Sequence, residues 1–323
     1  MSGPGDGLLS LEAIRAAAER IAPHLHRTPL LRSQSTDARS GCPVHLKAES
    51  LQKTGSFKPR GALNAVLGLD APARATGLIT IYAGNHAQAV AWAARQVGTR
   101  AAVVMPGKAP QSKVDAVRGY GAEVLFHDDN ATLFDRVEQE RAARGATFIH
   151  PFDDPVVLAG AGTVGLEITE DAPDVEVVVV PVGGGGLLGG VASAVRGLKP
   201  NVRIVGVELA EGPGLGPALA AGKPVPVTRP ATVADGMIPP FVGRLPLAIA
   251  QAAVDAVVTV TEAEIHDAML WLFTRCKLVV EGSGAAALAA VFAGRTGTKP
   301  GQPVAVILSG GNVDPTRLAA LKG

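Results

Sequence analysis

Four glycines follow an apolar run in the second half of the chain and could bind an anion. They are residues 183–186, placed after the valine-rich segment 177–180 and before a predicted helix that starts near residue 189. Glycine lets successive backbone N–H groups converge on one anion, with the positive end of the helix dipole behind them, and phosphate suits such a place. No Gly-Lys-Ser/Thr follows, as a P-loop requires, and the spacing is not that of a dinucleotide-binding motif with its acidic partner. A tight strand-to-helix turn without a ligand is the alternative interpretation.

One lysine could supply a reactive amine. Lys58 stands between Phe57 and Pro59 at the predicted start of a helix, directly after the small residues 54–56. Partial burial lowers the pKa of an amine, which then serves as a nucleophile and a base near neutral pH. The alternative is a solvent-exposed side chain, because most lysines are exposed.

A third stretch follows a predicted strand and could hold a carboxylate. After residues 78–82 come Ala83, Gly84, Asn85 and His86. Small residues at the start of a helix leave backbone N–H groups free for a carboxylate, and the Asn85 amide offers both a donor and an acceptor. For His86, a structural hydrogen bond is the alternative to a catalytic role.

A fourth stretch lies near the C-terminus. Ser309 ends the predicted strand 304–308 and precedes Gly310 and Gly311. Ligands bind at the carboxyl ends of strands in parallel sheets, so this serine is a candidate binding residue. The alternative is a simple turn.

The elements that would carry these residues alternate between strand and helix along most of the chain. Residues 78–149 read as strands separated by amphipathic helices, and residues 175–308 contain a second such series. This alternation predicts an α/β fold with mostly parallel sheets and crossover helices. One helix of the second series is predicted to run without interruption over residues 262–277.

The composition favours a globular protein. Of the 323 residues, 47% are hydrophobic, which suffices for a large core. Charged residues make up 18%, below the usual share of about 25%, which argues against disorder. The net charge is +1 and no basic block stands out, so a nucleic-acid partner has no electrostatic support.

Several features indicate a soluble cytoplasmic protein with no membrane partner. The N-terminal residues lack the basic start and apolar run of a signal peptide, and no apolar run is long enough for a membrane span. The two cysteines, Cys42 and Cys276, read as free thiols of a reducing compartment. No Cys/His cluster has the spacing of a zinc site.

Together and in this order, the four stretches resemble the fold-type II pyridoxal-phosphate (PLP) family that contains threonine dehydratase and serine racemase. The resemblance runs from about residue 14 to the C-terminus and includes the motifs at residues 27–30, 47–49, 105–113 and 121–124. It is strongest toward threonine/serine dehydratases without a regulatory domain, because no such domain follows Ser309.

The resemblance implies PLP as the cofactor and a role for each binding residue. Lys58 forms the Schiff base with PLP and is the base nearest the substrate α-carbon. Phe57 packs near the pyridine ring, Asn85 bonds the ring 3-oxygen, and Ser309 faces the pyridine nitrogen. The glycine turn holds the phosphate through Gly183, Gly184, Gly185, Gly186 and Leu187. The substrate carboxylate is bound by Ser56, Ala83, Gly84, Asn85 and His86.

The implied fold is tryptophan synthase β-like, with two three-layer α/β/α domains. Residues 1–55 and 147–323 form the large PLP-binding domain, and residues 56–146 form the small domain. The cofactor lies in the cleft between them, and two chains form a homodimer.

The implied reaction converts a small L-β-hydroxy amino acid, such as threonine or serine, to a 2-oxo acid and ammonia. A neutral serine at the ring nitrogen makes the cofactor a weaker electron sink than a carboxylate would, which favours loss of a β-hydroxyl over a long-lived carbanion. The alternatives are a dehydratase of hydroxyaspartate or another β-hydroxy amino acid, a serine/threonine racemase, and a non-catalytic protein that binds a phosphate ligand. The joint presence of Lys58, Asn85 and Ser309 argues against the last of these.

The chain departs from the family pattern at a few positions. Ala83 stands where serine racemases have a serine that acts on the opposite ring face, so efficient racemisation is not expected. Tyr82 replaces a usual serine, which predicts an altered substrate pocket, and Ala161 replaces a common glutamine. Glu208 matches a glutamate of relatives with a divalent-ion site, but glycines and a proline follow where an aspartate would fall, so no metal ligand is assigned.

Overall fold

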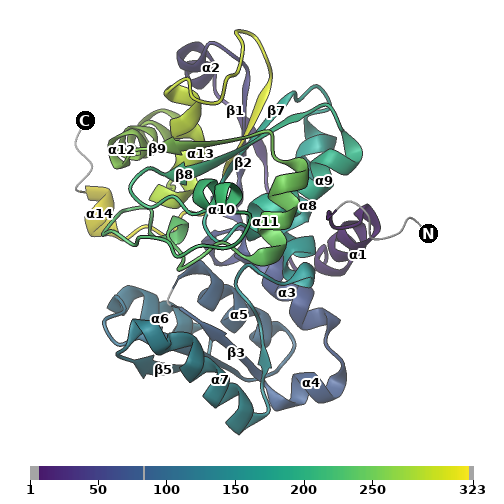
Figure 1. Ribbon diagram of the computed structural model, residues 1–323, viewed down its shortest axis with the longest axis vertical. Coiled ribbons are helices and arrows are strands. Elements are labelled where there is room, and N and C mark those ends of the chain that lie inside the picture. The colour runs from purple at the N-terminus through teal and green to yellow at the C-terminus, as the bar shows by residue number, and fades with distance from the viewer. Residues whose placement is uncertain (1–6, 83, 320–323) are drawn as a thin grey trace.

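The computed structural model describes residues 7–82 and 84–319, and it contains two separate sheets, each within its own lobe (Figure 1). The larger sheet has six strands in the order β1-β2-β10-β7-β8-β9, of which only the β1–β2 pair is antiparallel. The smaller sheet has four parallel strands in the order β5-β4-β3-β6. The predicted α/β class with mostly parallel sheets and two domains is therefore confirmed.

The strands of the larger sheet are β1 (Leu30–Arg32), β2 (Val44–Ala48), β7 (Val177–Pro181), β8 (Arg203–Leu209), β9 (Ala256–Val260) and β10 (Val304–Leu308). The strands of the smaller sheet are β3 (Leu78–Ile81), β4 (Ala101–Pro106), β5 (Glu123–His127) and β6 (Thr147–Phe148). The helices are α1 (Leu11–Ile21), α2 (Gln34–Ser40), α3 (Lys58–Gly68), α4 (Ala71–Thr76), α5 (Asn85–Gln96), α6 (Gln111–Gly119), α7 (Leu133–Arg144), α8 (Pro155–Asp171), α9 (Gly186–Leu198), α10 (Leu215–Ala221), α11 (Arg244–Ala253), α12 (Glu262–Trp271), α13 (Gly282–Phe292) and α14 (Pro315–Ala319).

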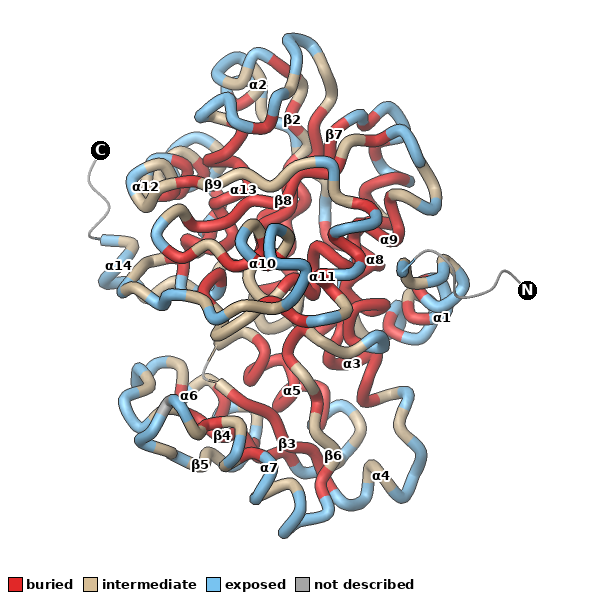
Figure 2. Tube along the Cα trace, in the orientation of Figure 1, coloured by how far each residue is buried: buried red, intermediate tan, exposed pale blue. Residues whose placement is uncertain are grey.

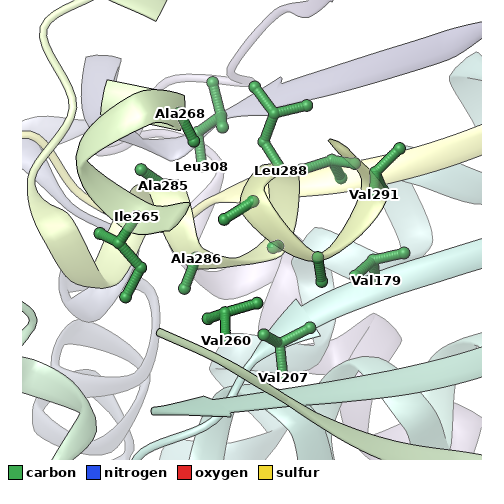
Figure 3. Packing of buried hydrophobic residues seen from close by; sticks show 14 of the residues in the cluster. Val179, Val207, Val260, Ile265, Ala268, Ala285, Ala286, Leu288, Val291 and Leu308 are labelled. Atoms are coloured by element: carbon green, nitrogen blue, oxygen red, sulfur yellow. The ribbon is translucent and has the colours of Figure 1, made fainter. Parts of the chain in front are cut away.

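Helices cover both faces of the larger sheet, which explains the apolar run of β7. Successive side chains of a strand point to opposite faces. Val177 and Val179 belong to the core that α12 and α13 cover, whereas Val178 and Val180 belong to the core under α8, α9 and α11. All four valines are fully buried, as Figure 2 shows by the red colour of this strand. In Figure 3, the small residues of α13 let this helix lie close between α12 and the strands β7, β8 and β10.

The smaller sheet is covered in the same way. On one face, β3 and β4 pack against α3, α5 and α6, and on the other they pack against α7. Because β6 pairs with β3, residues 147 and 148 extend this sheet. We therefore propose a small domain that runs from about residue 56 to residue 148, two residues beyond the expected boundary at 146.

The predicted helix over residues 262–277 is wrong at its end. The α-helix α12 stops at Trp271, and a π-helix, Leu272–Cys276, follows it. In this arrangement the Trp271 ring donates a hydrogen bond to Thr36 Oγ1 (3.0 Å) while Leu272 stays fully buried. A π-turn holds one extra residue, so two successive side chains can face the core where regular helical spacing would separate them.

Candidate active site

A cavity of about 370 Å³ lies where strands of both sheets end. Its lining includes residues that follow or end β3, β4, β7 and β10, namely Tyr82, Pro106, Gly183 and Ser309. The carboxyl ends of parallel strands are where α/β proteins bind ligands. The cavity therefore lies between the two sheets.

The structure brings most of the predicted site residues to this one cavity. They come from four separated stretches of chain and are Phe57, Lys58, Gly84, Asn85, His86, Gly183, Gly184, Gly185, Gly186, Leu187 and Ser309. Ser56 is fully buried behind this lining, and its hydroxyl has no hydrogen-bond partner among the described residues. Ala83 lies outside the described residues.

Lys58 is the first residue of α3 and its side chain points into the cavity lining. Its amine donates a hydrogen bond to the Pro151 carbonyl (2.8 Å) and lies 5.1 Å from the centre of the Phe57 ring. Burial lowers the pKa of Lys58 to about 8 from its ordinary value of 10.5. Close packing fixes α3 against α8, because a Cβ atom on Gly61 would lie 2.6 Å from the Val157 carbonyl oxygen.

This lowered pKa leads to a first testable expectation. Only the unprotonated amine attacks an aldehyde, so covalent attachment of PLP to cofactor-free protein should accelerate with rising pH around a midpoint near 8. Stopped-flow absorbance at a series of pH values measures this midpoint. A midpoint at the ordinary lysine value of 10.5 would contradict the assignment.

The glycine turn presents backbone donors to the cavity at the start of α9. Among the described residues, none accepts a hydrogen bond from the N–H groups of residues 183–188. Gly185 has φ +89°, a conformation that favours glycine. A Cβ atom on Gly183 would lie 2.5 Å from the Gly236 carbonyl oxygen, and one on Gly184 would overlap the Phe152 ring. These free donors at a helix N-terminus, across the cavity from a buried amine, fit the phosphate and aldehyde of the expected cofactor.

Gly184 gives a second test. Replacing Gly184 with alanine must displace either the Phe152 ring or the turn, so we expect PLP affinity to fall at least about tenfold, the effect of losing one or two charge-assisted hydrogen bonds. Gly68→Ala is the matched control, since a Cβ atom at Gly68 meets nothing within 4 Å. Fluorescence titration with PLP measures both affinities. Equal affinities in the two variants would show that the turn does not hold the phosphate.

Asn85 and His86 begin α5 and both line the cavity. His86 Nε2 lies 3.0 Å from the Ile149 carbonyl, while its buried Nδ1 has no partner among the described residues. Burial first, and the nearby Lys58 and His150 next, lower the pKa of His86 to about 3. His86 is therefore neutral. Its Nε2–H donates to the Ile149 carbonyl, and its Nδ1 is left as an acceptor. This arrangement suits a structural or binding role better than proton transfer.

Other lining residues were not among the predicted site residues. Glu281 is half-buried in the cavity lining, and Lys113 of α6 forms an ion pair with Asp235 (2.6 Å) that joins the two domains. Arg229 also lines the cavity. The sequence signal for Glu281 is a single acid between Val280 and three small residues at a predicted helix start, and such an acid is more often a helix cap.

Tyr82 lies in the cavity wall with an unusual backbone. Its φ is +76°, and its ring packs edge-on against Phe134 with 5.9 Å between ring centres. Phe134 in turn contacts Phe241 and His150, so an aromatic cluster supports the wall on this side. Burial raises the pKa of Tyr82 to about 12, so its hydroxyl is neutral. Ala161, the other departure from the family pattern, is buried in α8 and is not part of the lining.

Glu208 is engaged by the backbone of its own loop. Its carboxylate accepts hydrogen bonds from the N–H groups of Gly214 (2.7 Å), Leu215 (2.5 Å) and Gly216 (2.9 Å), at the start of α10. No group of three metal-ligating side chains occurs within residues 7–82 and 84–319. These three N–H groups thus compensate the negative charge of the Glu208 carboxylate, as a bound cation would otherwise do.

A third expectation follows for metal removal. We expect EDTA to leave both the thermal midpoint and any ammonia release unchanged, because three N–H donors already compensate the Glu208 carboxylate. Differential scanning fluorimetry with EDTA, and then with excess Mg²⁺, checks this. A chelator-induced loss that Mg²⁺ restores would contradict it.

The chain matches known proteins over most of its length. A family model described as pyridoxal-phosphate dependent enzyme matches residues 21–310. An L-threonine ammonia-lyase of Thermotoga maritima is 44% identical over 312 residues, which are 95% of this chain and 76% of the relative. Maize serine racemase superposes with a TM-score of 0.92 at 37% identity, covering 96% of each chain. The T.th. threonine deaminase superposes with a TM-score of 0.86 at 43% identity, covering 94% of this chain and 99% of that one. Within the described residues, no helix has the length and apolar character to span a bilayer.

Proposed function

The chain belongs to the family of pyridoxal-phosphate dependent enzymes, and from this premise we propose that it is a lyase acting on small L-β-hydroxy amino acids. L-Threonine or L-serine would lose its β-hydroxyl as water and its amino group as ammonia, leaving a 2-oxo acid. The water that leaves is taken up again by hydrolysis of the C=N bond. Relatives named threonine ammonia-lyase and threonine deaminase, each more than 40% identical, support this reaction.

A single observation carries the proposal. The Lys58 amine and the free N–H donors of the glycine turn line the same cavity. Lys58 Nζ donates to the Pro151 carbonyl, and the ring of the next residue, Phe152, lies against Gly184. An aldehyde and a phosphate joined by one aromatic ring would meet both groups at once.

Several residues of the cavity lining have separate roles in this reaction. PLP, when bound, withdraws the electron pair left on the substrate α-carbon after its proton departs. Lys58 would hold the cofactor through its amine, and its Nζ, whose pKa burial lowers to about 8, would take the α-proton. Residues 183–187 would hold the phosphate, Phe57 would flank the ring, and the neutral Ser309 hydroxyl would face the ring nitrogen. The N–H groups of residues 84–86 at the start of α5 hold the substrate carboxylate.

An ammonia-release screen tests the reaction. Purified holoenzyme is incubated with L- and D-threonine, L- and D-serine, and 3-hydroxyaspartate, and 2-oxo acid is measured beside ammonia. We expect release from the L-threonine or L-serine sample and little from the D-enantiomers. Release from none of them, or loss of optical activity without ammonia, would refute the dehydratase and favour a racemase.

We further propose that two copies form a homodimer in the cytoplasm. Three large apolar side chains, Leu51, Phe273 and Val279, are 50%, 45% and 45% exposed, and a second copy could cover them. Both Cys42 and Cys276 are free thiols, which suits a reducing compartment. Sedimentation equilibrium distinguishes a dimer from a monomer of 32.8 kDa.

A further inference from the structure

A chain of hydrogen bonds runs from the backbone of residue 54 to a carboxyl group in the cavity. Asn312 Nδ2 donates to the Thr54 carbonyl (2.7 Å) and to Asn85 Oδ1 (2.8 Å). Asn85 Nδ2 then donates to Glu281 Oε1 (2.6 Å). Asn85, Glu281 and Asn312 all line the cavity.

The direction of this chain is fixed at its first member. The Thr54 carbonyl can only accept, so the Asn312 amide must turn its NH₂ group toward it. The same NH₂ group reaches Asn85, which therefore presents Oδ1 to Asn312 and its own NH₂ group to Glu281. Asn85 uses one N–H on Glu281 and keeps the other. An ionised carboxylate, which can only accept, completes this order of donors.

Glu281 stands at the N-cap position of α13, but its side chain does not cap this helix. It precedes α13 with φ −74° and ψ 164°, yet its side chain makes no hydrogen bond to the first turn. Its backbone N–H donates to the Gly310 carbonyl (3.0 Å), and a Cβ atom on Gly310 would lie 2.5 Å from Glu281 Oε1. A glycine at position 310 thus makes room for the carboxyl group to face Asn85.

The surroundings of Glu281 shift its pKa toward neutral pH. Burial is the main cause that raises its pKa to about 7, and the charge of Asp235 adds to it. The Asn85 amide, the Lys113 charge and the Asn312 backbone N–H act in the opposite direction. Lys113 and Asp235 are paired with each other, so the charge of each offsets part of the effect of the other on Glu281.

We propose that Glu281 is a positioning residue that, while ionised, holds the Asn85 amide with one N–H free for the cofactor, and that proton uptake by Glu281 weakens this hold. This inference rests on one part of the proposed function, the contact between Asn85 and the cofactor ring. A protonated Glu281 can still accept through its carbonyl oxygen, but it loses the negative charge that strengthens the hydrogen bond from Asn85.

The test is to record the absorption spectrum of the holoenzyme without substrate between about pH 5.5 and pH 8.5. This range brackets the pKa expected for Glu281. We expect the cofactor band to shift with a midpoint near 7 in the unmodified protein. Glu281→Gln still accepts from Asn85 but does not titrate, so its spectrum should stay constant. Glu281→Asp restores a titrating carboxyl and should restore a midpoint. Glu264→Gln, in a capping box on α12, is the control that should titrate normally.

A second variant covers the case in which Glu281→Gln does not fold. Asn312 is exposed, and in Asn312→Asp an ionised side chain cannot donate to Thr54 or Asn85. We expect PLP affinity to fall roughly tenfold in this variant, as for loss of one hydrogen bond to a charged group. A Glu281→Gln spectrum that titrates like the unmodified protein, or unchanged affinity in Asn312→Asp, would overturn the proposal. Neither readout needs turnover, so a failure of the lyase reaction is seen separately.

Discussion

Lys58→Ala is expected to abolish 2-oxo acid formation and the covalent attachment of PLP together. Among the lysines of the described cavity lining, Lys58 is the one whose amine donates to the Pro151 carbonyl and whose pKa burial lowers to about 8. Removing it takes away both the covalent anchor and the base for the α-proton. General-base catalysis alone is worth about 10²–10⁴-fold, so turnover should fall by at least about 10³-fold.

Two measurements check this result. Ammonia release from L-threonine gives the rate, and mass spectrometry after borohydride reduction locates PLP on the chain. Lys53→Ala is a matched control, because Lys53 is five positions away and is not part of the cavity lining. PLP fixed at another lysine, or a Lys58→Ala protein as active as the control, would refute the assignment.

Arg60→Met is expected to lower the free energy of unfolding by about 3–5 kcal/mol, the cost of removing one partner of a buried ion pair. Arg60 is 2% exposed and donates to both carboxylate oxygens of the fully buried Glu49 (2.8 Å each). It also forms an ion pair with Glu167 (2.7 Å), which binds Lys47 (2.5 Å) in turn. Without the guanidinium, one carboxylate stays buried without a compensating charge.

Urea unfolding measured by circular dichroism gives this change. Arg27→Ala is the control, because Arg27 also pairs with two acids but is 52% exposed, and surface pairs are worth about 0–1 kcal/mol. A loss below about 1 kcal/mol in Arg60→Met would show that the pocket left by the arginine admits water to Glu49. Because Arg60 is two residues from Lys58 on α3, the same variant should also weaken PLP binding.

Much of the scaffold could be predicted from local sequence. The valine run of β7 and its tetraglycine turn show a buried strand entering a helix, because only small residues permit that turn and only apolar ones suit a strand covered on both faces. The position of Lys58 before Pro59 marks the start of α3. The shared cavity of these two stretches follows from one rule, since parallel strands place their carboxyl ends together.

The close partners of these residues were decided only by the tertiary structure. Glu281 and Asn85 are 196 positions apart, and Asn312 and Thr54 are 258 apart, so no local pattern joins them. The hydrogen bond from Trp271, at the end of α12, to Thr36 likewise joins residues 235 positions apart. Local sequence determines which backbone shapes are possible, through steric limits and apolar periodicity. Which buried polar groups pair, and hence which of them are charged, depends on the positions of distant segments, because a hydrogen bond or an ion pair forms only across a few ångströms.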